Sequence, residues 1–213
     1  MDCCDASVYD EHFDERRARE QLRAYRDDGP RDWTARLIAS LSEGGVDGLT
    51  VLDIGAGVGA VHHALLAEGA ASAVDVDASG PYIAVAQGEA ARRGIADRVT
   101  YLKGDAVALG DEVPEADLVA LDRVVCCYPD MERLVTLAAT RTRRRLGLVL
   151  PRDDAWIRAA IAASNLLGRL GRRPLPTYVH RTRAITEVAS RAGLAPAGAQ
   201  RGRIWQTLVY ARP

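Results

Sequence analysis

The residues best suited to chemistry form a glycine-rich loop. Its order is Asp53-Ile54-Gly55-Ala56-Gly57-Val58-Gly59, directly after an apolar segment and at the start of a predicted helix. Glycines let the backbone pass close beneath a ligand, and a helix start offers N–H groups without intrahelical partners. The G-x-G-x-G spacing differs from the G-x-G-x-x-G of dinucleotide sites, and the leading carboxylate repels phosphate but suits an ammonium group. The segment is therefore predicted to be a cofactor-binding loop, with a purely structural turn as the alternative. The predicted binding residues are Asp53, Gly55, Ala56, Gly57 and Gly59.

An aspartate at the end of the next predicted strand could bind a ribose. Asp77 and Ala78 follow the segment 73–77, and a carboxylate at that exit can accept two hydroxyl protons. Asp75 competes for the role, but side chains alternate along a strand, so it would point the other way. We therefore favour Asp77 over Asp75.

A third acidic position follows the segment 99–102. In Gly104-Asp105-Ala106, the Asp105 carboxylate would accept from an adenine amino group and the Ala106 N–H would contact the ring. Gly-Asp is also an ordinary turn sequence, so this signal gains weight only from its place after the third strand.

The elements that must position these residues alternate between strands and helices. Such alternation predicts an α/β fold with a mostly parallel sheet, closed by an antiparallel pair over 195–204 and 206–211. We expect residues 1–45 to form an N-terminal helical cap and residues 46–213 the main domain. The predicted strands are 50–54, 73–77, 99–102, 117–121 and 146–150, and the predicted helices are 14–27, 81–93, 130–140, 154–168, 182–192, one from Asp32 as N-cap, and one through Leu65-Leu66.

Composition limits the class of protein. The chain has 213 residues, 48% of them apolar, and no apolar run approaches the roughly 18 residues that span a bilayer. Its first five residues are polar and acidic, unlike a signal peptide, so we expect a cytoplasmic protein without a membrane partner. The adjacent pairs Cys3-Cys4 and Cys126-Cys127 lack C-x-x-C spacing, which favours reduced thiols and no metal site.

The net charge of −1 conceals a strong asymmetry. Residues 1–140 hold 13 Lys and Arg against 26 Asp and Glu, whereas residues 141–213 hold 15 Arg against 3 acids. Such a distribution is typical of a nucleic-acid face, of intramolecular pairing or of an anionic substrate. Aromatic residues make up only 5% of the chain, so platforms for base stacking are scarce. We favour intramolecular pairing or an acidic ligand over nucleic acid.

Together the three acidic motifs resemble those of the class I S-adenosylmethionine (SAM)-dependent methyltransferases, over about residues 48–150. The resemblance implies a Rossmann-like α/β fold: a seven-stranded, mostly parallel sheet with helices on both faces and the last strand antiparallel. It also implies SAM as cofactor and S-adenosylhomocysteine (SAH) as product, bound across the carboxyl ends of the early strands. Asp122, at the exit of the fourth strand, is placed with the cofactor residues.

A narrower resemblance is to magnesium-protoporphyrin O-methyltransferases and related small-molecule enzymes. The stretch Ala116–Pro129 is similar to their F-D-V-V-V-C-L-D-V-L-I-H-Y-P, Tyr178-Val179-His180 to their Y-L-H, and Tyr9–Phe13 to their N-terminal aromatic motif. Cys127 replaces the family's His, and Arg123 replaces an Asp. These departures leave a small acceptor implied but not the porphyrin.

Candidates for the acceptor side come from three segments. His180 is the best base by chemistry, because its unperturbed pKa is near 6.5, and a structural role is the alternative. Cys127 and Tyr9 complete the catalytic candidates, with His12 a lesser one. We interpret His62 and His63 as scaffold. A group that could receive an anionic substrate, or else form a solvated basic face, is Asn165, Arg169, Arg172 and Arg173.

The predicted function is SAM-dependent methyl transfer to a nucleophilic oxygen or thiol sulfur of a small molecule, with secondary metabolism as its setting. The main alternative is an RNA or protein methyltransferase that uses the basic C-terminal region. A non-catalytic or nicotinamide-binding module is a third hypothesis. The sequence predicts neither the acceptor nor the oligomeric state.

Overall fold

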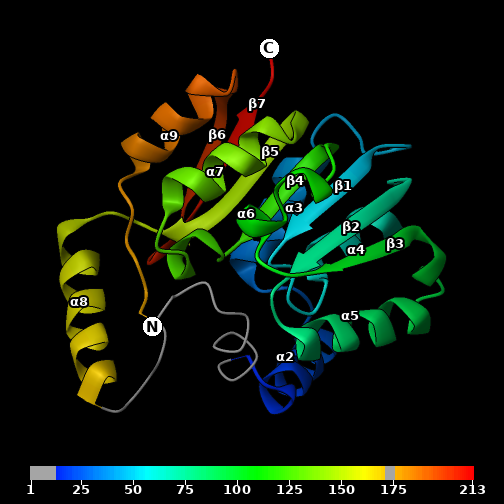
Figure 1. The fold of residues 1–213 in the computed structure, drawn as a ribbon, viewed down its shortest axis with the longest axis horizontal. Coiled ribbons are helices and arrows are strands. Elements are labelled where there is room, and N and C mark those ends of the chain that lie inside the picture. Colours follow the sequence, from blue (N-terminus) through cyan, green and yellow to red (C-terminus); the bar gives the residue numbers. More distant parts are fainter. Residues whose placement is uncertain (1–12, 171–175) are drawn as a thin grey trace.

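A single seven-stranded sheet organises the molecule (Figure 1). The computed structural model describes residues 13–170 and 176–213. Strand order is β3-β2-β1-β4-β5-β7-β6; β1 to β5 are parallel, and β7 runs antiparallel to both of its neighbours. The predicted fold class is confirmed. The strands are β1 (Thr50–Ile54), β2 (Ser72–Asp77), β3 (Val99–Lys103), β4 (Ala116–Asp122), β5 (Thr142–Pro151), β6 (Ala195–Arg201) and β7 (Trp205–Ala211).

Helices cover both faces of this sheet. One face carries α3 (Asp32–Ser42), α4 (Ala60–Ala67) and α5 (Gly80–Arg92), and the other carries α6 (Ala106–Leu109), α7 (Met131–Thr140) and α9 (Thr182–Arg191). Helix α2 (Glu15–Asp28) packs on α5, and α8 (Ala155–Leu170) stands at the side of the molecule (Figure 1). Three short 3-10 turns are η1 (Ala96–Arg98), η2 (Gly110–Glu112) and η3 (Val125–Cys127).

Helix α3 belongs to the core. Leu37 and Leu41 are fully buried against β5, and Gly147 provides the space that they fill. Asp32, the predicted N-cap, is instead the first helical residue, and Arg31 precedes it without a capping bond from its side chain. The division of the chain at residue 45 into a helical cap and a main domain remains a prediction.

Strand β6 forms the outer edge of the sheet. Every residue of it is exposed, and its register against β7 shifts between Pro196 and Gly198. The other outer strand, β3, pairs with β2 without such an irregularity. Among the helices of the described residues, none combines the length and hydropathy needed to cross a bilayer.

Many arginines of the C-terminal part pair with acids from the first 140 residues. Arg141 lies 2.7 Å from Asp111, and Arg191 lies 2.8 Å from Glu132. These ion pairs are of the kind expected if the acidic and basic parts of the chain pair within the molecule. Further pairs of this kind are Arg143–Glu115, Arg144–Asp117 and Arg145–Glu43.

Candidate active site

The glycine loop takes a backbone course that side chains would obstruct. Gly55, Gly57 and Gly59 have φ angles of 65°, 60° and 81°, a region that residues with a Cβ rarely adopt. A Cβ on Gly55 would also stand 2.5 Å from Val124, and one on Gly59 would stand 2.5 Å from His63. Glycine is thus required at these positions by the positive φ angles, and at Gly55 and Gly59 also by the lack of room for a Cβ.

Asp53 faces away from the loop, toward the helix that follows. Its Oδ2 accepts from the backbone N–H of His62 at 3.3 Å and lies 2.9 Å from His62 Nδ1, and both side chains are buried. A carboxylate thus occupies the positive end of α4, where a phosphate would otherwise bind. The predicted contact of Asp53 with a cofactor ammonium remains a prediction, because Asp53 is not among the residues that line the pocket.

Asp77 fixes the loop from the neighbouring strand. Its Oδ2 accepts from the N–H of Gly57 at 3.0 Å, and its Oδ1 accepts from the N–H of Ser79 at 2.8 Å. Asp77 and Ala78 line the pocket, whereas Asp75 is fully buried outside it. Burial, together with Asp53 and Asp77, raises the pKa of Asp75 well above its usual range. Of the two aspartates only Asp77 lines the pocket, and its contact with a ribose remains a prediction.

Asp105 begins helix α6 and lines the same pocket. Its Oδ1 caps the helix by accepting from the N–H of Val107 at 2.8 Å, and its Oδ2 accepts from the hydroxyl of Tyr128 at 2.9 Å. Gly104 and Ala106 also line the pocket. Any adenine amino group that binds Asp105 must therefore share it with, or take it from, Tyr128.

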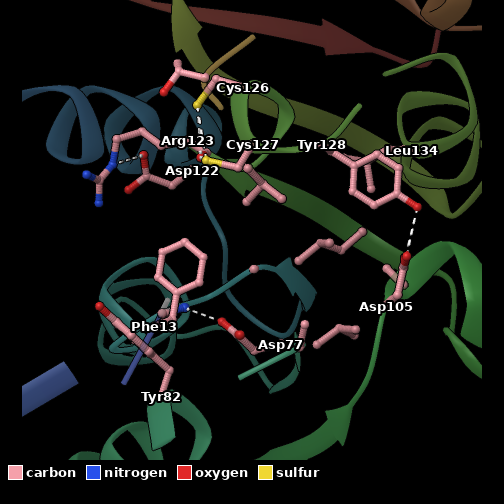
Figure 2. A pocket seen from close by; sticks show the side chains of 18 of the residues that line it. Phe13, Asp77, Tyr82, Asp105, Asp122, Arg123, Cys126, Cys127, Tyr128 and Leu134 are labelled. Carbon is pink, nitrogen blue, oxygen red and sulfur yellow. Dashed lines mark hydrogen bonds and ion pairs between the residues drawn. The ribbon is translucent and has the colours of Figure 1, made fainter. Parts of the chain in front are cut away.

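One pocket of about 490 Å³ joins these residues. Figure 2 shows Asp105 and Tyr128 at one side of it, and Asp122, Arg123, Cys126 and Cys127 at another. Its walls are mostly apolar, and its volume lies in the range of small-molecule sites. Among the described residues, Arg123 is the only cation in the lining, against the carboxylates Asp77, Asp105 and Asp122. Residues 56 and 59 of the loop lie outside the lining.

Asp122 ends β4 and is held by a helix far away in sequence. Its Oδ2 accepts from the hydroxyl of Thr34 on α3, and its Oδ1 lies 3.6 Å from Nε of Arg123. Burial raises the pKa of Asp122 above its usual range, although Arg123 and Thr34 act in the opposite direction. Arg123 has a φ of 62°, the one positive value at a non-glycine position in the described chain. Its guanidinium carbon lies 5.6 Å from the ring centroid of Trp33.

Both cysteines of the second pair lie in the pocket wall, on the turn η3. Their Sγ atoms are 3.8 Å apart, and Cys126 donates to the carbonyl of Arg123 at 3.2 Å. The contact between the two Sγ atoms lowers the pKa of Cys127, and the same contact, with burial, raises the pKa of Cys126. Cys127 is thus the more readily ionised thiol. Within the described residues, no group of three His, Cys, Asp or Glu could hold a metal ion.

His180 lies behind the wall rather than in it. Its Nε2 is 3.0 Å from the carbonyl of Val125, so Nε2 must carry the proton, and burial lowers the pKa of the ring. The N–H of Tyr178 donates to the carbonyl of Cys126 at 2.7 Å. These bonds attach segment 176–181 to η3. Such an attachment is what we expect if His180 has a structural role instead of a catalytic one. Its role as a base remains a prediction.

Other predicted residues have mixed outcomes. Asn165 exchanges two hydrogen bonds with the backbone of Thr177, at 2.8 and 3.0 Å, so its amide is engaged within the protein. His62 and His63 are fully buried, as the scaffold interpretation expects. Tyr9 and His12, together with Arg172 and Arg173, lie outside the described residues, and so does the side chain of Arg169.

Sequence reasoning missed several residues of the pocket wall. Phe13 packs edge-on against Tyr82 with ring centroids 5.8 Å apart (Figure 2). The carbonyl of Phe13 accepts from the hydroxyl of Ser79. Trp205 also lines the pocket, and its ring centroid lies 5.6 Å from that of Trp33. Only Phe13 had a sequence signal, as the last residue of the N-terminal aromatic motif.

Residues 51–144 match the family model described as a methyltransferase domain. The chain carries a SAM-dependent methyltransferase domain. The match begins in β1, includes the whole glycine loop and ends in β5. The predicted enzyme class and cofactor are thereby confirmed. No curated protein matches this methyltransferase in sequence.

Solved structures share the whole fold of this methyltransferase at low identity. Magnesium protoporphyrin IX methyltransferase from Synechocystis PCC 6803, with bound SAH, has a TM-score of 0.76 at 21% identity, over 98% of this chain and 100% of that chain. An O-methyltransferase family protein from Burkholderia thailandensis has a TM-score of 0.70 at 20% identity, over 96% and 62%. An O-methyltransferase family 2 protein from Planctomyces limnophilus, in complex with apigenin, has 0.69 at 20%, over 93% and 62%.

Proposed function

We propose that this methyltransferase transfers the methyl group of SAM to a nucleophilic oxygen or thiol sulfur of a small molecule, in secondary metabolism. The observation that carries the proposal is the single pocket that continues from the glycine loop to an apolar region near Cys127, Thr177 and Trp205. A volume of about 490 Å³ with apolar walls suits a compact organic acceptor better than a polymer chain. One structural neighbour is named a magnesium protoporphyrin IX methyltransferase and another was crystallised with apigenin, and both support a small-molecule acceptor.

The residues of the pocket fit SAM. Gly55 and Gly57 offer backbone without side chains, and the lining carboxylates outnumber the guanidinium. SAM carries a sulfonium and an ammonium group, so a negative lining attracts it, whereas a pyrophosphate would be repelled. We propose Asp77 and Ala78 for the ribose, Asp105 and Ala106 for the adenine, and Gly55, Ala56, Gly57 and Gly59 for the methionyl part, with Asp53 acting from behind the loop. Asp122, at the exit of β4 in the same pocket, is the remaining proposed cofactor residue.

The chemistry asks little of the protein beyond alignment. SAM supplies an electrophilic methyl group on a leaving sulfur that needs no protonation. The chain must hold the acceptor in line and exclude water, for which the apolar walls are suited. A hydroxyl acceptor must also lose a proton, whereas a thiol ionises more easily.

Two measurements test the proposal. Thermal shift should report stabilisation by SAM and by SAH but not by NADH, because only a ligand that binds the folded state raises the melting temperature. Tritiated methyl transfer from SAM should label small hydroxyl or thiol compounds. Labelling of RNA or protein in place of small molecules would favour an RNA or protein methyltransferase. The absence of stabilisation by SAH would favour a non-catalytic module.

A further inference from the structure

The pocket contains a positive charge to which the cofactor proposal gives no task. Arg123 is the only cation among the described lining residues, against three carboxylates. The cofactor proposal provides acidic side chains for the ribose and the adenine, but no cation for an anionic group. We propose that Arg123 binds a carboxylate in this pocket, either the methionyl carboxylate of SAM or a carboxylate of the acceptor. This inference rests on the proposed function and concerns the ligands of the same site.

The guanidinium of Arg123 has unused hydrogen-bond donors. Its Nε is buried and lies 3.6 Å from Oδ1 of Asp122, which is beyond hydrogen-bond distance. Nη1 and Nη2 are not buried, and neither donates to a described residue. The side chain as a whole keeps 38% of its surface exposed. The two terminal nitrogens are therefore accessible to a ligand, and their N–H groups match the two oxygens of a carboxylate.

The charge of Arg123 acts on groups at two sides of the pocket. Burial raises the pKa of Tyr82 to about 12, and the charge of Arg123 opposes that rise. The contact with Cys126 lowers the pKa of Cys127, and Arg123 adds to that lowering. Tyr82 and Cys127 belong to different walls of the pocket, as Figure 2 shows. A positive charge that acts on both walls also acts on an anionic ligand between them.

The backbone and the packing of Arg123 orient its guanidinium. The φ of 62° is a conformation that residues with a Cβ rarely adopt, and strained positions of this kind are concentrated at ligand sites. The guanidinium carbon lies 5.6 Å from the ring centroid of Trp33. Trp33 in turn packs against Trp205, which lines the pocket. This packing limits the orientations of the side chain, so that less conformational freedom is lost when a ligand binds.

Two other arginines near the pocket are less suited to this role. Arg152, which follows β5, has its Nε 2.7 Å from Asp154, and its Nη1 donates to the carbonyl of Gly202. Arg17 of α2 also acts on Tyr82, but it does not line the pocket. A carboxylate that enters the pocket therefore meets the guanidinium at the exit of β4 as its cationic partner among the described lining residues.

Calorimetry with two ligands tests whether the carboxylate is that of the cofactor. The ligands are SAH and its decarboxylated analogue, in which hydrogen replaces the carboxylate. If Arg123 binds the methionyl carboxylate, Arg123→Gln should weaken SAH binding about 10- to 100-fold, the range expected for hydrogen bonds between charged groups. The affinity for the analogue should stay within a few-fold of the wild type, because the analogue lacks the group that Arg123 binds.

Methyl transfer from tritiated SAM tests whether the carboxylate is that of the acceptor. The matched acceptors are 3-mercaptopropionate and 1-propanethiol, which share a thiol and differ in the carboxylate. If Arg123 binds an acceptor carboxylate, Arg123→Gln should raise KM for 3-mercaptopropionate about 10- to 100-fold. KM for 1-propanethiol and the affinity for SAH should then stay within a few-fold of the wild type.

Three further variants separate the charge from the backbone strain. Arg123→Lys keeps the charge but not the paired donors, so it should retain an intermediate preference for the carboxylate ligand. Arg123→Asn should lose that preference as Arg123→Gln does, but it should unfold at a higher urea concentration, because Asn adopts a positive φ more readily than Gln. Arg152→Gln is the matched control and should leave the preference at its wild-type value.

Two results would overturn the proposal. One is that Arg123→Gln leaves the preference within both ligand pairs unchanged, and the other is that it weakens both members of each pair equally. Labelling of neither thiol would count against the proposed function, and the comparison of SAH with its analogue would then decide the role of Arg123 by itself.

Discussion

At the scale of single residues, two glycines of the cofactor loop have the same conformation but different surroundings. Gly55 and Gly57 differ in φ by only a few degrees, at 65° and 60°. A Cβ on Gly55 would stand 2.5 Å from Val124, whereas one on Gly57 would make an ordinary 3.7 Å contact with Tyr82. Comparing alanine at the two positions separates backbone strain from overlap.

Gly55→Ala should therefore destabilise the fold more than Gly57→Ala. We expect about 1 kcal/mol for Gly57→Ala from strain alone, and about 2–4 kcal/mol for Gly55→Ala, where the overlap with Val124 adds to the strain. Urea unfolding measures both. Val124→Ala in the Gly55→Ala background should recover part of the loss, and equal effects of the two alanines would contradict this account.

The buried His63 makes stability depend on pH. Burial, then the neighbouring His62, lowers the pKa of His63 to about 3, so the folded state stays neutral while the unfolded chain takes a proton below about 6.5. Its contribution to stability is therefore lost as pH falls from about 6.5 toward 3, at up to roughly 1.4 kcal/mol per pH unit. His63→Gln should flatten the pH dependence of the unfolding free energy in that window, and parallel curves would refute the prediction.

At the scale of elements, one buried carboxylate attaches α2 to the domain. Glu89 on α5 is fully buried and lies 2.8 Å from Arg26 of α2, with Arg92 and Arg93 on its other sides. The hydrogen bond from Arg92, with those of Arg26 and Arg93, holds the pKa of Glu89 well below its usual range. Because Gln21 of α2 and the adjoining Phe13 line the pocket, this junction also shapes the site.

Glu89→Gln should cost about 3 kcal/mol of unfolding free energy and weaken SAH binding, because it leaves three arginines without their carboxylate. The depressed pKa means that the wild-type contribution is present above about pH 4.3 and is lost as pH falls, so the two proteins should converge in acid. Urea unfolding and calorimetry measure the two effects. Glu20→Gln, which breaks an exposed pair with Arg16, is the matched control and should change little.

The elements with local signals were predictable, and their long-range contacts were not. The predicted strand 50–54 matches β1 in full, because an apolar run followed by glycines marks both of its ends. Helix α6 was missed, since its cap Asp105 was assigned to a ligand and only four residues follow. The bond from Thr34 to Asp122 spans 88 positions, and nothing in either local sequence announces it.

At the scale of the whole molecule, ion pairs among the described residues join five of the 15 arginines in residues 141–213 to acids from the first 140 residues. The five arginines at 141, 143, 144, 145 and 191 each contact an acid from the other part of the chain. An RNA backbone would have to displace those carboxylates before it could gain from the same arginines. The pairing thus argues against the polymer-modifying alternative, which the sequence alone could not exclude.

We accordingly expect RNA to bind more weakly than about 10 μM at physiological salt, as non-specific contacts do. Filter binding across salt concentrations measures this. Glu115→Gln with Asp117→Asn releases Arg143 and Arg144 and should tighten RNA binding. Nanomolar affinity of the wild type with a steep salt dependence would show that the basic region is available after all.

The exposed strand β6 carries its own protection against misassembly. An outer strand offers unpaired N–H and C=O groups to any other chain, and aggregation commonly starts there. Pro196 has no backbone N–H, and the register against β7 shifts beside it, two features that make regular pairing of a strand less favourable. Residues 195–198 do not line the pocket, and their sequence limits the ability of this exposed edge to pair with a strand of another chain.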